Sequence, residues 1–367
     1  MALPFFIEQF DLSLSLAGLL LFASSAGYLA ASSAFPYLTK IKSTKSVISA
    51  GFVLIAVGYG LLPFLPAWWL AVLAGFAANL GCGTIDVGYN TLIAGLEPQR
   101  AKPAMSWLHF SYGIGALLGP VFLSRLVAVG FPWSSFYLTT SFLTVLFLGL
   151  WHFKELDETD PKAEQHTDSA NITIFKEPLF WVLFTSIFIY VCAETALVGW
   201  IPTFLTDMGV SATNATVGIS IIWLGITIGR GLCGKLSVFL APKSILLVLT
   251  SGTALAMTIL IFVKPVWLVF AVLFLAGLFL SAIFPMIMLQ GAMIFPSSTA
   301  EVTSGLVIAG SLGGLVGPSI LGIIGEFHSL QMGIAVVAAM MLFSTLLITR
   351  CPSAPQSAKS EKEVFLD

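Results

Sequence analysis

Charged side chains are scarce in this chain of 367 residues. Asp, Glu, Lys and Arg together make up 9% of it, whereas a soluble domain carries about 25%. Hydrophobic residues make up 57%. So few charges cannot cover a globular surface in water. The composition therefore excludes a water-soluble domain.

Motifs for catalysis and for tightly bound groups are also lacking. The sequence has no phosphate-binding loop, nucleophile motif or metal-ligand cluster, and its polar loops are too short to house a catalytic domain. Its four cysteines have no CxxC or metal-like spacing, so we interpret them as free thiols that pack as small apolar groups. We therefore expect no enzymatic activity, no cofactor, no metal and no use of ATP as the energy source.

Long hydrophobic runs are abundant. A bilayer core needs roughly 20 consecutive apolar residues per helix, and helices in lipid tolerate Gly and Pro. Eleven stretches meet this requirement and predict an all-α, polytopic membrane protein. They cover residues 14–36, 45–63, 67–95, 104–129, 132–153, 178–206, 214–239, 243–263, 265–294, 299–326 and 329–349.

Basic residues gather at one end of these predicted spans. If the ends that follow the first, third, seventh and last spans are cytoplasmic, thirteen of the sixteen basic residues are cytoplasmic. Arg125 and Lys264 then fall outside, and Arg230 lies within a span. By the positive-inside rule, this pattern predicts a multi-pass protein of the cell (inner) membrane with a cytoplasmic C-terminus.

One long polar segment divides the predicted spans into two groups. Residues 154–177 are mixed in charge and rich in turn formers, so we interpret them as a cytoplasmic linker. We expect an N-terminal helical bundle of five spans at 1–153 and a C-terminal bundle of six spans at 178–350. The remaining residues, 351–367, are expected to form a cytoplasmic tail.

An internal repeat relates the two bundles. GALLGP at 115–120 resembles GGLVGP at 313–318, at an offset of 198 residues. The same offset places LPFFIE at 3–8 on IPTFLT at 201–206, where the sixth span ends. The first residues thus match the end of a helix whose body is absent. We interpret the chain as two pseudo-symmetric bundles, with eleven spans visible and most of the first helix missing.

Asp86 is an ionisable residue inside a predicted span. Such a residue costs at least about 2.5–3.5 kcal/mol on insertion scales, and it therefore marks a candidate functional site. Gly83, Asp86 and Asn90 are spaced by three and four residues and share one helix face. A carboxylate beside an amide suits a wall that binds a polyol and accepts a proton. The alternative is a protonated Asp86 that bonds across a helix interface.

Glu194 and Arg230 stand out in the same way. Trp200 follows Glu194 by six residues, and Trp223 shares a helix face with Arg230. Because a lone guanidinium is costly in lipid, we expect Arg230 either to pair with Glu194 in a structural salt bridge or to clamp a ligand. We expect Glu194 to bind ligand hydroxyls or to balance Arg230.

Aromatic residues form the next layer of candidates. Trp107, His109, Phe110 and Tyr112 cluster near the start of the fourth span. An aromatic ring can stack on the C–H face of a sugar, and His109 titrates near neutral pH, so we include His109 as a candidate binding residue. The alternative is that these rings face lipid, because 13% of the chain is aromatic.

Several motifs match those of one transporter family: GTID at 83–86 with Asn90, the segment 190–194, WLGITIGR at 223–230, IFP at 283–285 and EVTS at 301–304. On these residues the chain resembles the major facilitator superfamily, and within it the fucose–galactose–glucose:proton symporter branch. That branch carries Gly-x-x-Glu followed four residues later by Asn in its fourth helix, and Asp86 here replaces the Glu. The resemblance implies that Asp86 takes part in sugar binding and proton coupling.

The chain departs from this family pattern in two places. YLTKIK at 37–42 replaces the Asp-Arg loop that usually follows the second helix. Family members also carry a second coupling acid in the first helix, which is missing here. The candidate proton-coupling residues of this chain are therefore Asp86 and Glu194.

The main hypothesis is a secondary active transporter that moves a sugar or related polyol by alternating access, with proton-coupled uptake. One alternative is a drug or metabolite efflux transporter with a Phe-rich pocket, and another is a non-transporting sensor, which the missing helix favours. The expected partners are a small solute, protons and the lipid bilayer, without nucleic acid, for a monomer. We expect the solute to bind near the midplane between the halves, in contact with Asp86, Asn90, His109, Glu194, Trp200, Trp223 and Arg230.

Overall fold

The computed structural model describes residues 2–94, 98–153, 172–237 and 239–352. Within these ranges the regular secondary structure is helical, without a strand. Eleven of the described helical stretches are long and apolar enough to cross a membrane. The prediction of an all-α, polytopic membrane protein is confirmed. Most of the predicted linker and all but two residues of the predicted tail lie outside the described residues.

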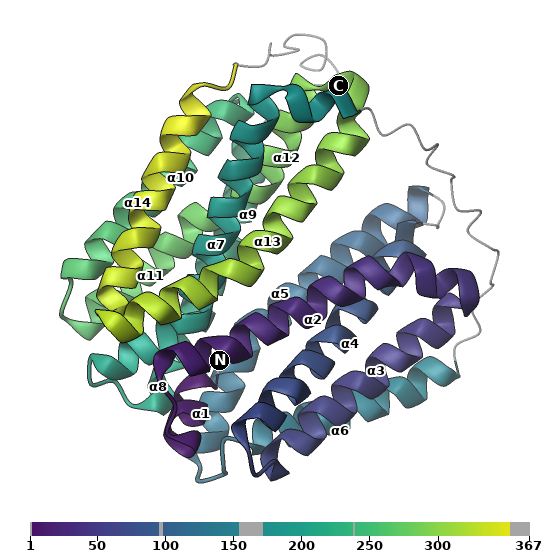
Figure 1. Ribbon diagram of the computed structural model, residues 1–367, viewed down its shortest axis with the longest axis vertical. Helices are drawn as coiled ribbons and strands as arrows, with labels where there is room; N and C mark the ends of the chain where they lie inside the picture. The colour runs from purple at the N-terminus through teal and green to yellow at the C-terminus, as the bar shows by residue number, and fades with distance from the viewer. Residues whose placement is uncertain (1, 95–97, 154–171, 238, 353–367) are drawn as a thin grey trace, which may run out of the picture. The chain divides into compact units, whose positions relative to one another are not determined.

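The helices follow the predicted spans closely (Figure 1). Three short 3₁₀ turns join them, at Leu62–Phe64, Ile172–Lys176 and Pro296–Ser298. In chain order the α-helices are α1 (Leu3–Phe10), α2 (Leu14–Ile41), α3 (Thr44–Leu61), α4 (Trp68–Ala94), α5 (Pro98–Ala128), α6 (Ser135–His152), α7 (Pro178–Asp207), α8 (Ala212–Ala215), α9 (Val217–Leu236), α10 (Pro242–Phe262), α11 (Val266–Leu280), α12 (Ile283–Ile294), α13 (Thr299–Phe327) and α14 (Leu330–Thr349).

Serine side chains set the starts of α2 and α3. The hydroxyls of Ser13 and Ser43 each accept a hydrogen bond at 3.3 Å from the backbone N–H three residues later. The first N–H groups of a helix have no partner within the helix, and such caps satisfy one of them. The connections before α2 and α3 therefore each end in a capping serine.

The first span is longer than the sequence predicted. The predicted span ended at Pro36, whereas α2 continues to Ile41 with Pro36 inside it. Proline removes one backbone donor and usually breaks a helix in water. In a membrane protein, neighbouring groups re-satisfy the freed backbone, and the helix continues through the proline.

The span predicted at 265–294 is broken into two helices. Its first part, α11, ends at Leu280, and α12 begins at Ile283. Pro285 has no N–H to bond the carbonyl of Ser281, four residues earlier, and its ring clashes with a carbonyl in that position. The break therefore leaves the Ser281 carbonyl available to another donor.

Internal contacts divide the described chain into two compact units. Boundaries between the units fall inside α7, α9, α13 and α14. The units therefore differ from the N-terminal and C-terminal bundles predicted at 1–153 and 178–350, and those two bundles stay a prediction. Unit 1 holds the described residues of 1–169, 195–223 and 314–333, and unit 2 holds those of 170–194, 224–313 and 334–367.

Unit 1 contains a close contact between two helices. In this unit α4 lies between α2 and α3, and α6 lies against α3 (Figure 1). A Cβ on Gly83 of α4 would stand 2.8 Å from the backbone oxygen of Tyr28, and one on Gly27 of α2 would overlap the carbonyl of Phe76. Glycine at both positions therefore brings the backbones of α2 and α4 together beside Tyr28.

In unit 2, glycines likewise bring α9 against α11. A Cβ on Gly229 would stand 2.6 Å from both the Leu278 oxygen and the Cβ of Ser281. Gly225 lies one turn earlier, and a Cβ there would overlap the carbonyl of Phe274. This approach places the residue after Gly229, Arg230, beside the break between α11 and α12.

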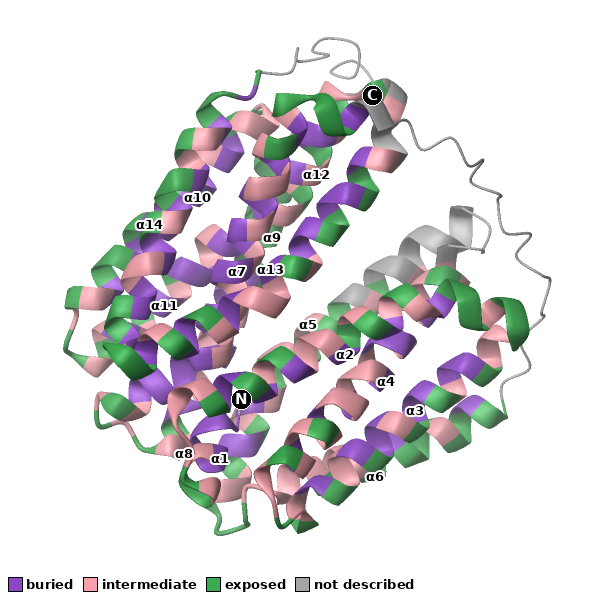
Figure 2. Cartoon of the chain, in the orientation of Figure 1, coloured by how far each residue is buried: buried purple, intermediate pink, exposed green. Residues whose placement is uncertain are grey.

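Large apolar side chains remain exposed on α6 (Figure 2). Phe142 is 69% exposed, Phe147 57% and Leu150 59%. A monomeric protein in water rarely keeps so extended an apolar face open. A lipid bilayer covers such a face without cost, in agreement with a membrane-spanning helix.

Candidate functional site

Asp86 lies on α4 in unit 1, and both of its carboxylate oxygens accept hydrogen bonds. The phenol O–H of Tyr28, on α2, donates to Oδ2. The amide of Asn90, one turn along α4, donates to Oδ1 at 3.1 Å and to the backbone carbonyl of Asp86 at 2.8 Å. No cation forms an ion pair with Asp86 among the described residues. Two neutral donors therefore hold this carboxylate.

Tyr28 is the member of this group that sequence reasoning missed. The common face of Gly83, Asp86 and Asn90 was predicted from their spacing, and in the structure Asn90 does reach Asp86. Gly27 precedes Tyr28 in the chain, which is a signal for close helix packing. That signal does not name the partner helix, so the phenol could not be matched to Asp86 without the structure.

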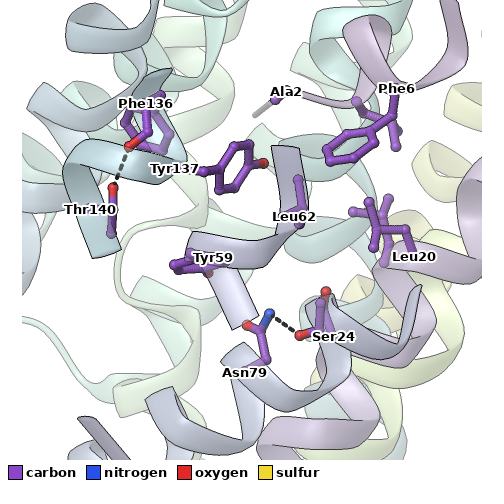
Figure 3. A pocket seen from close by; sticks show the side chains of 13 residues that line it. Ala2, Phe6, Leu20, Ser24, Tyr59, Leu62, Asn79, Phe136, Tyr137 and Thr140 are labelled. Atoms are coloured by element: carbon purple, nitrogen blue, oxygen red, sulfur yellow. Dashed lines mark hydrogen bonds between the residues drawn. The ribbon is translucent and has the colours of Figure 1, made fainter. Parts of the chain in front are cut away.

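A pocket of about 330 Å³ lies in the same unit, beside α1 (Figure 3). Aromatic side chains form much of its wall. The rings of Tyr59 and Tyr137 are 5.3 Å apart, and Phe6 of α1 lies 6.1 Å from Tyr137. The pocket therefore has the flat apolar surfaces that suit the C–H face of a ring-shaped solute.

Two polar residues that line this pocket, Ser24 and Asn79, lie on the helices that carry Tyr28 and Asp86. Asn79 of α4 lines the pocket seven residues before Asp86, which is about 10 Å along the helix. Ser24 of α2 lines it one helical turn before Tyr28. None of the binding residues predicted from the sequence lines the pocket within the described residues.

Glu194 and Arg230 both lie in unit 2, on α7 and α9. Glu194 accepts a hydrogen bond from Tyr190, one turn earlier, and Arg230 acts on it electrostatically. Arg230 donates from Nε to the carbonyl of Ser281 at 3.2 Å, the carbonyl that Pro285 leaves free. Within the described residues the two charges do not form the direct salt bridge that we considered. The guanidinium instead caps the broken helix.

The two predicted tryptophans have different surroundings in unit 1. Trp200 is 2% exposed, and its indole N–H donates to the carbonyl of Pro318 at 2.7 Å. Trp223 is half-buried, and its ring meets that of Tyr112 edge to face at 5.7 Å. Trp200 therefore has an evident packing role, whereas part of the Trp223 ring remains accessible. The side chain of His109, on α5, lies outside the described residues.

Comparison with protein families and known proteins gives consistent matches. The family model described as Major Facilitator Superfamily matches residues 1–307 and 224–365. The glucose/mannose transporter GlcP of Bacillus subtilis is 24% identical over 325 residues, which cover 85% of this chain and 80% of the relative. Sodium-dependent glucose transporter 1A of Mus musculus is 23% identical over 344 residues, which cover 82% of this chain and 79% of the relative.

The fold also matches a solved structure. The crystal structure of a D-xylose-proton symporter aligns with a TM-score of 0.73 at 15% identity. The alignment covers 93% of this chain and 89% of the symporter chain. At this low identity the match shows a shared fold.

Proposed function

Because the chain belongs to the Major Facilitator Superfamily, we propose that it is a secondary active transporter that moves a sugar or related polyol by alternating access. The observation that carries this proposal is the group formed by Tyr28, Asp86 and Asn90 inside the membrane-spanning region. A phenol, a carboxylate and an amide are the donors and acceptors that hydroxyl groups need. The two relatives named as glucose transporters support a sugar as the solute.

We further propose that protons drive this transport. A carboxylate in an ion pair resists protonation, because the nearby positive charge favours its charged form. Asp86 is held by neutral donors instead, so it can gain a proton without leaving a buried cation unpaired. Glu194, which is bonded by Tyr190, is the candidate for a second titrating group in unit 2. The proposal also includes that the transporter is a monomer and that its C-terminus lies on the cytoplasmic side of the membrane.

A proteoliposome screen tests the solute and the ion together. The purified full chain is reconstituted, and uptake of labelled hexoses and polyols is measured with a pH gradient, with a sodium gradient and with neither. We expect accumulation of at least one hexose above equilibrium only with the pH gradient. Accumulation driven by the sodium gradient alone would show that the coupling ion is sodium and not the proton. Absence of hexose movement in every arm, including counterflow, would overturn the sugar assignment.

Export of an amphipathic solute is the second candidate function. The lining of the pocket in unit 1 favours it, because most of its side chains are leucine or aromatic (Figure 3). Drug sensitivity of cells that express the chain separates the two functions. Resistance to amphipathic compounds without hexose uptake would favour export.

We expect Pro285→Ala to slow transport without lowering stability. Alanine restores an N–H that can bond the Ser281 carbonyl, so Arg230 loses its acceptor. Pro285 lies in the first turn of α12, where a proline is tolerated and where alanine, a good helix former, also fits. The melting temperature should therefore hold or rise while the initial uptake rate falls. A variant that unfolds earlier than the parent would show that Pro285 serves stability rather than Arg230.

A further inference from the structure

Asn90 has a fixed role toward Asp86. Its amide nitrogen donates both to Oδ1 and to the backbone carbonyl of Asp86, at 3.1 and 2.8 Å. If the amide turned over, its oxygen would face a carbonyl oxygen with no hydrogen between them. Oδ1 is therefore held as an acceptor. A proton that binds Asp86 goes to the other oxygen, Oδ2, which faces Tyr28.

Tyr28 can exchange its role because a phenol is both a donor and an acceptor. When Asp86 is ionised, the phenol O–H donates to Oδ2. When Oδ2 takes up a proton, its new O–H bond needs an acceptor, and the phenol oxygen is the atom that faces it. The phenol hydrogen then turns away from Asp86. One O–H bond forms at Oδ2, and the phenol keeps its own hydrogen throughout.

We propose that this reversal makes Tyr28 a proton-dependent binding residue, whose hydrogen becomes available to a solute hydroxyl when Asp86 is protonated. The inference rests on the proposed function, because it needs a hydroxylated solute. Tyr28 is 40% exposed, so its ring is not enclosed by the helices of unit 1. Ser24, one turn earlier on α2, already lines the pocket of that unit. The proton and the solute would thereby favour each other's binding.

Other titratable groups lie around this pair and must be separated from it. In the described part of unit 1 they are the thiol of Cys82 on α4 and the phenols of Tyr112 on α5 and Tyr59 on α3, of which Tyr59 bonds Cys82. Thiols and phenols ordinarily ionise above neutral pH, whereas a carboxyl group ionises in acid. A change between acidic and neutral buffer therefore leaves the charge of these thiol and phenol groups unchanged.

Infrared spectroscopy can follow the hydrogen bond of Tyr28 without any solute. The phenol C–O stretch differs between a donating and an accepting tyrosine, and the band that Tyr28→Phe removes belongs to Tyr28. We expect this band to move between neutral and acidic buffer in the purified full chain. In Asp86→Asn, whose amide N–H can donate to the phenol as a protonated acid would, we expect the band to stay at its acidic position. Tyr89→Phe, which alters another phenol on α4, should leave the band unchanged.

Equilibrium binding of labelled D-glucose provides the second readout. We expect the wild-type chain to bind glucose about tenfold more tightly in acidic than in neutral buffer, as the gain of one hydrogen bond allows. Tyr28→Phe should bind with the weaker affinity in both buffers. Asp86→Asn should bind with the tighter affinity in both. The double variant should behave like Tyr28→Phe.

The outcomes separate this inference from the proposed function. A Tyr28 band that does not respond to pH overturns the inference, whatever the chain binds. An unchanged pH dependence of glucose binding in Tyr28→Phe also overturns it and leaves sugar transport intact. A band that moves as expected, in a folded chain that binds none of the hexoses and polyols of the uptake screen in either buffer, keeps the reversal of the hydrogen bond but overturns sugar as the solute.

Discussion

Asp86→Asn removes the accumulation of labelled hexose in proteoliposomes with an inward proton gradient, while exchange of hexose across the membrane continues in part. The amide keeps the size of the side chain and its contact with Tyr28, but it cannot gain and lose a proton. A gradient of one pH unit is worth about 1.4 kcal/mol per proton, so one coupled proton supports about tenfold accumulation. In the variant we expect the internal concentration only to equal the external one.

The matched control is Asp207→Asn at the end of α7, where the carboxyl group is exposed. It removes the same charge and should leave accumulation at the parent level. Full accumulation in Asp86→Asn would remove Asp86 from the coupling mechanism. Equal losses in both variants would point to a general effect of charge on the reconstituted protein.

Gly225→Leu should cause the largest loss of stability among the single substitutions considered. A Cβ at this position of α9 would overlap the Phe274 carbonyl and stand 2.8 Å from the backbone nitrogen of Leu278. A backbone cannot turn away as a flexible side chain can, so α9 and α11 must separate. We expect a cost of about 2 kcal/mol or more, from overpacking and from the contacts that are lost.

Gly231→Leu on the same helix is the control, because a Cβ there meets nothing within 4 Å. Thermal unfolding in detergent, followed by the loss of the monodisperse peak on size exclusion, measures both variants. Gly225→Leu should unfold well below the parent, and Gly231→Leu close to it. Equal melting temperatures for the two variants would contradict the close approach of α9 to α11.

The spans could be predicted from the sequence because lipid leaves few choices. Every backbone polar group in a bilayer must be satisfied within the protein, so a long apolar run becomes a helix. The predicted span 265–294 is present as one membrane-crossing run, Val266–Ile294, but its helix is interrupted between Leu280 and Ile283. Pro285 was visible in the sequence, but Pro36 and Pro318 lie inside unbroken helices, so a proline alone does not predict where a span is interrupted. That Arg230 would bond the freed carbonyl depends on the packing of α9 against α11, which the sequence does not contain.

The candidate site was predictable only where its members share one helix. Asp86 and Asn90 are four residues apart on α4, so their contact follows from helix geometry. Tyr28 lies 58 residues from Asp86 on another helix, and its partner depends on the register between α2 and α4. For Trp200, the sequence suggested a role that its surroundings in the structure do not share. A tryptophan near a charge suggested a binding role, whereas its N–H is engaged by Pro318.

The glycines between α2 and α4 also govern how these helices can move. Gly27 of α2 lies against the backbone of α4, and Gly83 of α4 lies against the backbone of α2. Each glycine leaves a notch in its own helix that the backbone of the other helix fills. Sliding one helix along the other would drive larger side chains into these notches. We therefore expect the two helices to move as one rigid unit, which carries Tyr28 and Asp86 together.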